Sequence, residues 1–414
     1  MTSTLCQEQT LRPANIRPLL PVKTIPHRPA GHPYPGSPES HPVYMKKQRV
    51  LVVGQTPPPY HGQAMMTQRL LDADYQKIKL YHVRMAFSKS VASVGTFQLA
   101  KLFHMVAIVA RVIGCRLRYR VKTLYYMPAG PNLTPVLRDI FILTLTRPLF
   151  NHTIFHFRAA GLSEFVETQP TIIKWLARRT YRSPDVAIHL SARNPDDGGY
   201  FKARRTVVVS NGLEDAAQPY LPIHRTTTSP VHILFVGLLR ESKGVMTLLA
   251  AAAILQQEGV PIRVSLVGGF TSPEFQKAVE TYCHTHHLQD IVDFAGVQQG
   301  EDKWRYFREA DIFCFPSHYE SESFGNVAVE AMMFSLPVVA THWRGIPDIV
   351  ADGQTGCLVP IKDPKATAAA LRQLILHPDE RHRLGEAGRA KFVAQYQLPT
   401  FIATMEDVLT MAQL

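Results

Sequence analysis

Residues 316–346 read PSHYESESFGNVAVEAMMFSLPVVATHWRGI, and the rest of the chain is organised around them. Two carboxylates, Glu322 and Glu330, stand in this stretch with seven residues between them. The preceding apolar run, 312–315, suits a buried parallel strand, and 327–334 has the composition of a buried helix. The stretch therefore predicts a strand, a loop and a helix, with one carboxylate in the loop and the other on the helix.

A loop that turns into a helix leaves free backbone N–H groups, and these favour an anion such as phosphate. Gly325 removes the side chain that would block a close approach, and Asn326 is the predicted N-cap of the helix. The pattern predicts carboxylates that face sugar hydroxyls beside a phosphate cradle. The alternative is two surface glutamates on either side of an ordinary helix start.

Length and composition point to a two-domain globular protein in a reducing compartment. The chain has 414 residues, which is more than a single hydrophobic core usually holds. Of these residues 46% are hydrophobic, which is typical of a globular protein. Its five cysteines show no paired spacing, which argues against a disulfide framework or a zinc site.

The formal net charge is +12, and the stretch from Tyr75 to Arg138 contains no acidic residue. A field of one sign concentrates anions, so the candidate partners are nucleic acid, anionic lipid headgroups or a diphosphate-bearing acceptor. Residues 97–114 are too polar to span a bilayer and instead predict an amphipathic helix on an anionic leaflet. A solvated basic face and a plain packed helix are the alternatives.

Two strand–loop–helix units stand earlier in the chain. A buried strand at 49–54 leads through a Pro-rich loop to Gly62, which is the anion-site arrangement of doubly wound folds. A second strand at 231–237 leads to Arg240 and Lys243, whose charges suit a departing diphosphate. The Pro/His-rich segment 1–46 lacks periodicity and predicts disorder, with Met45 as an alternative start.

The stretch 316–346 resembles the donor-site signature of glycosyltransferase family 4, whose members are retaining enzymes of the GT-B fold. The shared pattern is Glu322, then Phe-Gly, then Glu330 in Glu-Ala-Met, then Pro-Val-Val-Ala; Ser335-Leu336 stands where the family usually has Gly before Pro. The resemblance covers about residues 48–412. It implies two Rossmann-like α/β domains that face each other across a cleft, with a carboxy-terminal helix that crosses back to the first domain. The implied divisions are 1–46 (tail), 47–222 (acceptor-side domain), 223–392 (nucleotide-sugar domain) and 393–414 (crossover helix).

The resemblance also implies roles for individual residues. His156 would lie near the sugar's anomeric carbon, with Arg158 as a rival, while Glu322 would hold donor hydroxyls and Glu330 the ribose. The implied catalytic residues are His156, Glu322, Arg240 and Lys243. The implied donor-binding residues are Gly62, Gly237, Arg240, Lys243, Gly296, Val297, Glu322, Ser323, Phe324, Gly325, Asn326, Val327 and Glu330.

The implied reaction moves a hexose from a UDP- or GDP-sugar to an acceptor hydroxyl with retention, and needs neither a metal nor another cofactor. The acceptor would be lipid-linked or a saccharide in surface polysaccharide synthesis. The enzyme would be cytoplasmic, peripheral on the cytoplasmic face of the inner membrane, and would not bind nucleic acid. The alternatives are a sugar-nucleotide epimerase or phosphorylase of the same fold, or a sugar-binding relative without activity.

Overall fold

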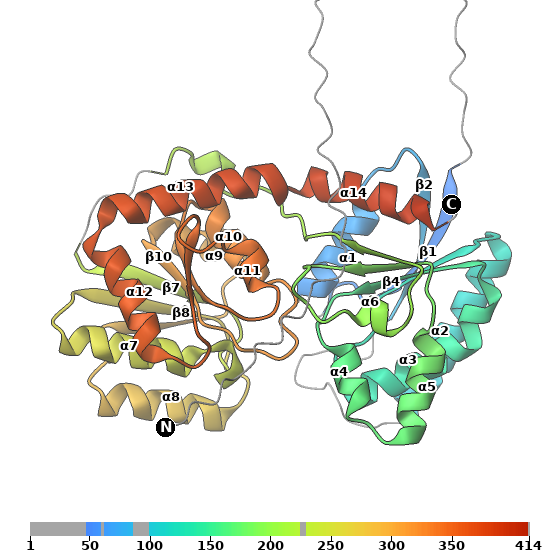
Figure 1. The fold of residues 1–414 in the computed structure, drawn as a ribbon, viewed down its shortest axis with the longest axis horizontal. Coiled ribbons are helices and arrows are strands. Elements are labelled where there is room, and N and C mark those ends of the chain that lie inside the picture. Colours follow the sequence, from blue (N-terminus) through green and yellow to red (C-terminus); the bar gives the residue numbers. More distant parts are fainter. Residues whose placement is uncertain (1–46, 59–61, 86–98, 224–228, 413–414) are drawn as a thin grey trace, which may run out of the picture. The chain divides into compact units, whose positions relative to one another are not determined.

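The computed structural model describes residues 47–58, 62–85, 99–223 and 229–412, and of residues 99–102 it describes only the backbone (Figure 1). The predicted disorder of segment 1–46 lies outside the described residues. Residues 46–414 form one compact unit, which contains two parallel six-stranded sheets.

The first sheet has the strand order β2-β1-β3-β4-β5-β6, and every neighbouring pair is parallel. Its strands are β1 (Gln48–Gly54), β2 (Ile78–Arg84), β3 (Thr123–Tyr126), β4 (His152–Phe157), β5 (Val186–His189) and β6 (Arg205–Val208). Its helices are α1 (Gly62–Asp72), α2 (Leu99–Arg118), α3 (Leu133–Thr146), η2 (Arg147–Leu149), α4 (Leu162–Glu167), α5 (Thr171–Tyr181), α6 (Asp197–Tyr200) and η3 (Gln218–Tyr220).

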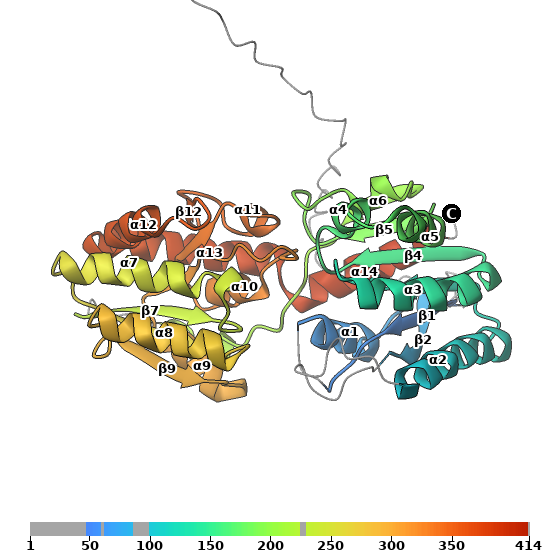
Figure 2. The same ribbon diagram turned by 90° about the horizontal axis from the view of Figure 1, so that it is seen from below.

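Both faces of the first sheet are buried, and alternate residues of one strand enter different cores. On β1, Val50 and Val52 pack with Met66 of α1, whereas Leu51 and Val53 pack with the α2–α3 side. Because parallel sheets carry helices on both faces, their strands read as continuous apolar runs, as 49–54 does. Figures 1 and 2 show α2, α3 and α5 side by side on one face of this sheet.

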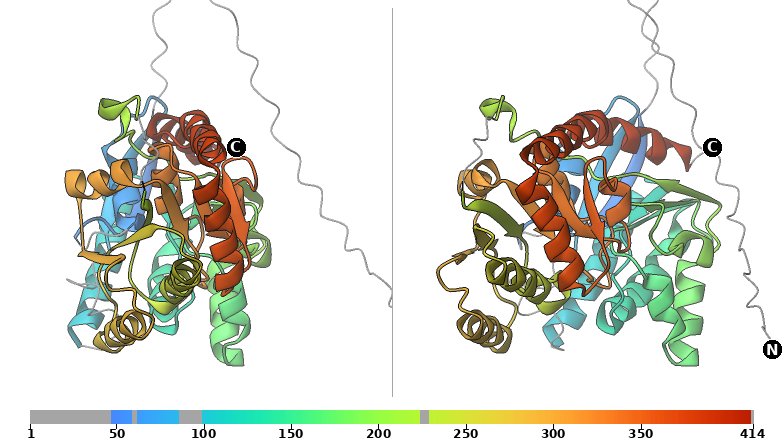
Figure 3. Two further views of the ribbon diagram at one scale, coloured as in Figure 1. Left: turned by 90° about the vertical axis from the view of Figure 1, so that its left-hand side faces the viewer. Right: turned by 60° about the vertical axis from the view of Figure 1, so that its left-hand side comes forward.

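The second sheet has the order β12-β11-β10-β7-β8-β9, and it is also parallel throughout. Its strands are β7 (Val231–Val236), β8 (Ile262–Val267), β9 (Val292–Gly296), β10 (Ile312–Phe315), β11 (Val338–Thr341) and β12 (Gly356–Val359). Its helices are η4 (Glu241–Lys243), α7 (Val245–Gln257), α8 (Pro273–Thr285), α9 (Gly300–Glu309), α10 (Asn326–Met333), α11 (Ile346–Ile349), α12 (Pro364–Leu376) and α13 (Pro378–Gln395). The helices α12 and α13, coloured orange to red, pack against each other (Figure 3).

The last helix, α14 (Leu398–Met411), packs on the first sheet rather than the second. It contacts β2, where Lys77 forms an ion pair with Asp407 at 2.6 Å. At its start, the backbone of Leu398 donates to the carbonyl of Leu213 at 2.9 Å. The chain thus returns to the sheet where it began. The predicted fold class, with two Rossmann-like α/β sheets, is confirmed.

Two predictions on the elements need comment. The predicted boundary at residues 222 and 223 falls in the connection between the sheets and stays a prediction. The helix predicted over 97–114 is observed as α2, which continues to Arg118 and so has Arg116 and Arg118 in its last turn. Among the described helices, none combines the length and the apolar character needed to cross a membrane.

Candidate functional site

Two cations and one carboxylate gather around the ring of Tyr319, in the loop after β10. The ammonium of Lys243 lies 4.6 Å and the guanidinium of Arg240 4.9 Å from the ring centroid. The Lys243 Nζ also lies 2.6 Å from Oε2 of Glu322. The structure therefore brings together three of the predicted catalytic residues, although Tyr319 itself was not predicted.

A glycine allows the loop after β7 to reach this cluster. Gly244 has a φ of +81°, and a Cβ at this position would lie 2.0 Å from the carbonyl oxygen of Pro316. Only glycine tolerates both the left-handed backbone and the close approach. The Lys243-Gly244 pair is thus explained by packing between the loops that follow β7 and β10.

Glu322 is fixed in place and nearly buried. Its Oε2 accepts a hydrogen bond from the Ser317 hydroxyl at 2.8 Å as well as the ion pair from Lys243. Cations held over an aromatic ring in a partly desolvated site are preorganised, so they need little rearrangement to meet a developing negative charge.

The start of α10 differs from the prediction in one respect. The N-cap is Gly325, with a φ of +89°, whereas Asn326 is the first helical residue. The left-handed conformation explains the difference. Glycine adopts it at no steric cost, whereas asparagine has a Cβ and adopts it at a steric cost. Gly325 makes no side-chain cap bond, which suits first-turn N–H groups that receive an anion.

The residues on either side of this start have distinct positions. The Ser323 hydroxyl donates to the carbonyl of Arg158 at 2.6 Å. Phe324 is buried, with its ring 5.8 Å from that of Tyr396, so its side chain packs in the core and leaves only its backbone for a ligand. Val327 is partly buried in the first turn of α10.

Glu330 has a different partner from Glu322. Its Oε2 forms an ion pair with Lys303 of α9 at 2.7 Å, rather than with Arg240 or Lys243. The structure therefore places the second carboxylate between α10 and α9, one helical turn beyond Asn326. The sequence gives no spacing signal that would have identified Lys303.

Three further donor-site predictions, Gly237, Gly296 and Val297, fall at the carboxyl ends of β7 and β9, on either side of β8. A Cβ at Gly268 would lie 1.8 Å from the Gly237 carbonyl oxygen, and one at Gly269 would lie 3.1 Å from Val297. Val297 is exposed, and nothing lies within 4 Å of a Cβ built on Gly296. These glycines bring the three strand ends close together beside an open backbone segment.

On the first sheet, His156 and Arg158 lie at the carboxyl end of β4. His156 is fully buried, and its Nδ1 is 2.6 Å from the Tyr125 hydroxyl, while its Nε2 has no hydrogen-bond partner among the described residues. Burial lowers the pKa of His156 well below its usual value, and the neighbouring Arg158 lowers it further. The imidazole is therefore neutral, and its predicted contact with a sugar stays a prediction.

Arg158 is also buried, being 7% exposed, and within the part of the chain that the structure describes its Nε and Nη2 have no hydrogen-bond partner. Its Nη1 donates to Oδ1 of Asn211 at 2.7 Å. Burial lowers the pKa of this guanidinium, whereas the nearby Tyr125 raises it. A buried cation with unused donors is suited to an anionic or hydroxyl-rich ligand.

A chain of polar contacts links these residues to α10. Nδ2 of Asn211 donates to Oδ1 of Asn326 at 2.9 Å, and a Cβ at Gly62 would lie 3.4 Å from Nδ2 of Asn326. The structure thus links Arg158 to Asn326 through Asn211, and it places Gly62 directly beside Asn326. Asn211 was not predicted as a site residue, although the Asn-Gly pair after a strand would have indicated a structured turn.

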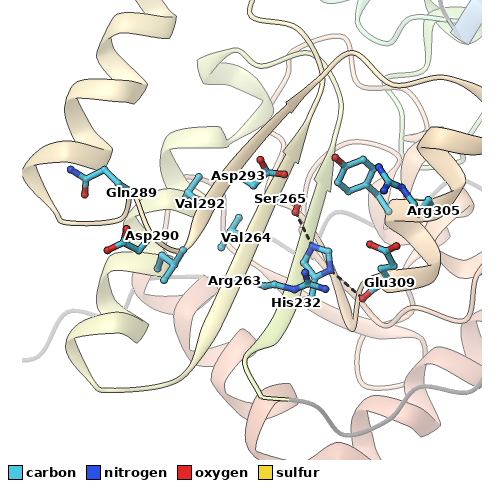
Figure 4. A pocket seen from close by; sticks show the side chains of 12 residues that line it. His232, Arg263, Val264, Ser265, Gln289, Asp290, Val292, Asp293, Arg305 and Glu309 are labelled. Carbon is cyan, nitrogen blue, oxygen red and sulfur yellow. Dashed lines mark hydrogen bonds between the residues drawn. The ribbon is translucent and has the colours of Figure 1, made fainter.

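A cavity of about 500 Å³ lies elsewhere, at the amino ends of β7, β8 and β9 (Figure 4). His232, at its wall, donates from Nδ1 to the carbonyl of Glu309 at 3.1 Å and accepts at Nε2 from the Ser265 hydroxyl at 2.9 Å. Both ring nitrogens are satisfied, and ligands of such sheets bind at the carboxyl ends of the strands. We therefore assign the candidate site to the Tyr319 cluster and α10, not to this cavity.

The described residues contain no group of three or more His, Cys, Asp or Glu side chains that could hold a metal ion. The predicted independence from metals and other cofactors stays a prediction.

Residues 221–391 match the family model described as Glycosyl transferases group 1. Relatives include D-inositol 3-phosphate glycosyltransferase of Corynebacterium urealyticum, 38% identical over 37% of this chain and 36% of that protein. Another is the amylovoran biosynthesis glycosyltransferase AmsK of Erwinia amylovora, 33% identical over 44% of each chain. The matches thus span less than half the length of these relatives.

Solved structures match over a larger part of the chain. Sucrose-phosphate synthase of Thermosynechococcus elongatus is similar with a TM-score of 0.66 at 20% identity, over 88% of this chain and 98% of that one. Anabaena HepE in complex with UDP is similar with a TM-score of 0.63 at 16% identity, over 88% of this chain and 100% of that one. At these identities the likeness establishes the fold alone.

Proposed function

We propose that the chain transfers a sugar from a nucleoside-diphosphate donor to an acceptor hydroxyl, because its residues 221–391 match the family model described as Glycosyl transferases group 1. The observation that carries the proposal is the cluster of Arg240, Lys243 and Glu322 around Tyr319, in the loops that lead to α7 and α10. UDP-sugars are the first donors to test, because the similar HepE structure contains UDP.

The cations act on the leaving group. When the bond from the anomeric carbon to the diphosphate breaks, negative charge develops on the phosphate oxygens, and Arg240 and Lys243 stabilise it. Arg240 supplies a fork of donors and Lys243 a point charge, while the first-turn amides of α10 add further donors. These side chains carry the neutralisation for which other transferases use a metal.

The carboxylates position the donor. Glu322 orients Lys243 and accepts hydrogen bonds from the donor sugar, and Glu330 accepts them from the ribose. Retention follows if the acceptor attacks the face from which the diphosphate departs, and this route needs no enzyme nucleophile.

The acceptor side is formed by the first sheet. His156 and Arg158 lie at the carboxyl end of β4, and Arg158 reaches α10 through the Asn211–Asn326 contact. Gly62, at the start of α1, lies directly beside Asn326. Arg158, with two unpaired nitrogens, is the best-placed donor to an acceptor or to the transferred sugar. A lipid-linked or saccharide acceptor in polysaccharide synthesis fits the basic surface, and AmsK is named for such a pathway. We place the protein on the cytoplasmic side of a membrane.

The test is a panel of UDP- and GDP-sugars incubated with the full chain, with and without membrane extract as the source of acceptor. We expect one donor to release its nucleoside diphosphate only when extract is present. Nuclear magnetic resonance of the product would show the donor's anomeric configuration retained.

Three results would overturn the proposal. Conversion of the donor sugar without any acceptor would indicate an epimerase, and release of a sugar phosphate would indicate a phosphorylase. No turnover of any donor would indicate a binding protein.

A further inference from the structure

One face of the first sheet is covered by three adjacent helices, α2, α3 and α5, which pack against one another in that order (Figure 2). Their outer surface carries large apolar side chains that no part of the described chain covers. We call this surface the outer helical face, and its apolar members are Phe103, Val106, Leu117, Leu137, Leu145, Ile172 and Trp175.

The exposure of these side chains follows the helical period, so it is a property of whole helix faces. On α2, Phe103 is 76% and Leu117 68% exposed, whereas Ile108 and Val112 on the opposite side are fully buried. On α5, Ile172 is 62% exposed, and Trp175 stands one turn later. A soluble protein rarely leaves so many large side chains exposed without a partner for them.

The same face is positively charged and has no free carboxylate. Exposed arginines accompany the apolar side chains on α2 and α5, and they are Arg111, Arg118, Arg178 and Arg179. From Tyr75 to Pro184 the sequence contains only three acidic residues, Asp139, Glu164 and Glu167.

Each of these three carboxylates is already paired. Asp139 is buried and accepts from the hydroxyls of Tyr126 and Tyr181 at 2.7 and 3.0 Å. Glu164 pairs with Arg344 at 2.6 Å, and Glu167 pairs with Lys174 at 3.0 Å and with Arg178. The net field of the outer helical face is therefore positive.

We propose that the outer helical face binds an anionic lipid bilayer, with its apolar side chains at the headgroup boundary and its arginines on the lipid phosphates. Apolar side chains flanked by arginine, with a tryptophan among them, are what an interfacial helix needs. A second copy of this chain is a poorer partner, since two such faces would bring like charges together. The biological role of this contact, which is to hold the enzyme beside a membrane-bound acceptor, rests on the proposed function. The contact itself does not depend on it.

The test is co-sedimentation of the full chain with vesicles, without any donor. Vesicles of phosphatidylglycerol mixed equally with phosphatidylcholine should bind the protein, and pure phosphatidylcholine should bind it at least about tenfold more weakly. Added salt should weaken the binding, because the lipid charge is screened.

Two variants locate the contact. The double variant Phe103→Ser and Trp175→Ser should lower the affinity about tenfold, whereas Leu376→Ser, at a 61% exposed position on α12, should leave it unchanged. Arg118→Gln with Arg179→Gln should lower the affinity and reduce its dependence on salt. Trp175 is exposed in the free protein, so its fluorescence emission should shift to the blue when it enters the bilayer. The chain has three tryptophans, and Trp175→Phe should remove the shift.

Equal binding to neutral vesicles, or equal binding by Phe103→Ser/Trp175→Ser and Leu376→Ser, would overturn the proposal. So would a dimer in solution that Phe103→Ser dissociates, because the face would then be covered by a second copy. Release of nucleoside diphosphate in detergent tests the proposed function separately, since it needs no vesicle.

Discussion

Lys243 is held from several sides: by the carboxylate of Glu322 at 2.6 Å and by the rings of Tyr319 and Phe315 at 4.6 and 5.6 Å. The ammonium therefore has little freedom before a donor arrives. A charge fixed in advance stabilises a transition state better than one that has to be ordered during the reaction.

Glu322→Gln tests this arrangement. The amide keeps the shape but loses the charge that orients Lys243, so we expect kcat/KM for the donor to fall about 100-fold, the range for loss of a preorganised electrostatic contact. Steady-state release of nucleoside diphosphate measures it. The matched control is Glu320→Gln, at an exposed position two residues away, which should keep the wild-type rate.

Equal rates in the two variants would contradict the role of Glu322. A large loss of thermal stability in Glu322→Gln, without loss of rate, would show that the carboxylate serves the fold alone.

At the residue scale, the sequence predicted the groups that carry charge but not the groups that hold them. Arg240, Lys243 and Glu322 were identified from their positions beside glycine-containing loops and from the resemblance to glycosyltransferase family 4. Tyr319 and Lys303 were missed, because their contacts depend on side-chain directions that no spacing reveals. Asn326 was assigned as an N-cap from its residue type, whereas the left-handed backbone at this point favours Gly325.

At the scale of the element, the start of α10 depends on Gly325. Its φ is +89°, and a Cβ there would lie 3.2 Å from the ring of Phe315. We expect Gly325→Ala to lower the free energy of unfolding by about 1–2 kcal/mol, the cost of a left-handed side chain, and to weaken nucleotide binding as well.

The matched control is Gly353→Ala. Gly353 also has a positive φ, of +68°, but nothing lies within 4 Å of its Cβ. Urea unfolding should show a similar loss of stability in both variants, while calorimetry should show weaker nucleotide binding only in Gly325→Ala. Unchanged nucleotide binding in Gly325→Ala would remove the start of α10 from the site.

Element types were predictable, and their ends were less so. The apolar runs that became β1, β7 and β10 follow from burial on both faces of a parallel sheet. The crossover helix was predicted within residues 393–414, and a helix is observed there from Leu398 to Met411. By contrast α2 was predicted to end at residue 114 and continues to Arg118, because basic residues such as Arg116 and Arg118 are favourable in the last turn of a helix.

At the scale of the whole molecule, several buried histidines make stability depend on pH. Burial is the largest cause that lowers the pKa values of five histidines, and these are His82, His156, His189, His232 and His318. The unfolded chain binds protons at these sites near the ordinary pKa of about 6.5, but the folded protein does not. Stability is therefore full above that pH and falls as the pH decreases through it.

Urea unfolding between about pH 7.5 and pH 5.5 should show this loss, with up to about 1.4 kcal/mol per pH unit from each histidine. Asp197 acts in the opposite direction, because burial raises its pKa to about 6, but it is one group against five histidines. His156→Asn should reduce the slope of the unfolding free energy against pH. His284→Asn, at an exposed position, should leave this slope unchanged. A flat profile would contradict the burial of neutral histidines.

The most direct test of the donor site is calorimetric titration of UDP and GDP into the full chain, Lys243→Met and Lys277→Met. Lys277 is an exposed lysine of α8 and serves as the control. We predict that one nucleotide binds the wild type and Lys277→Met equally, and binds Lys243→Met at least about tenfold more weakly, as expected when a charged contact to a phosphate is lost. Equal affinity of all three proteins, or no binding of either nucleotide by the wild type, would contradict the assignment of the donor diphosphate to the cluster around Tyr319.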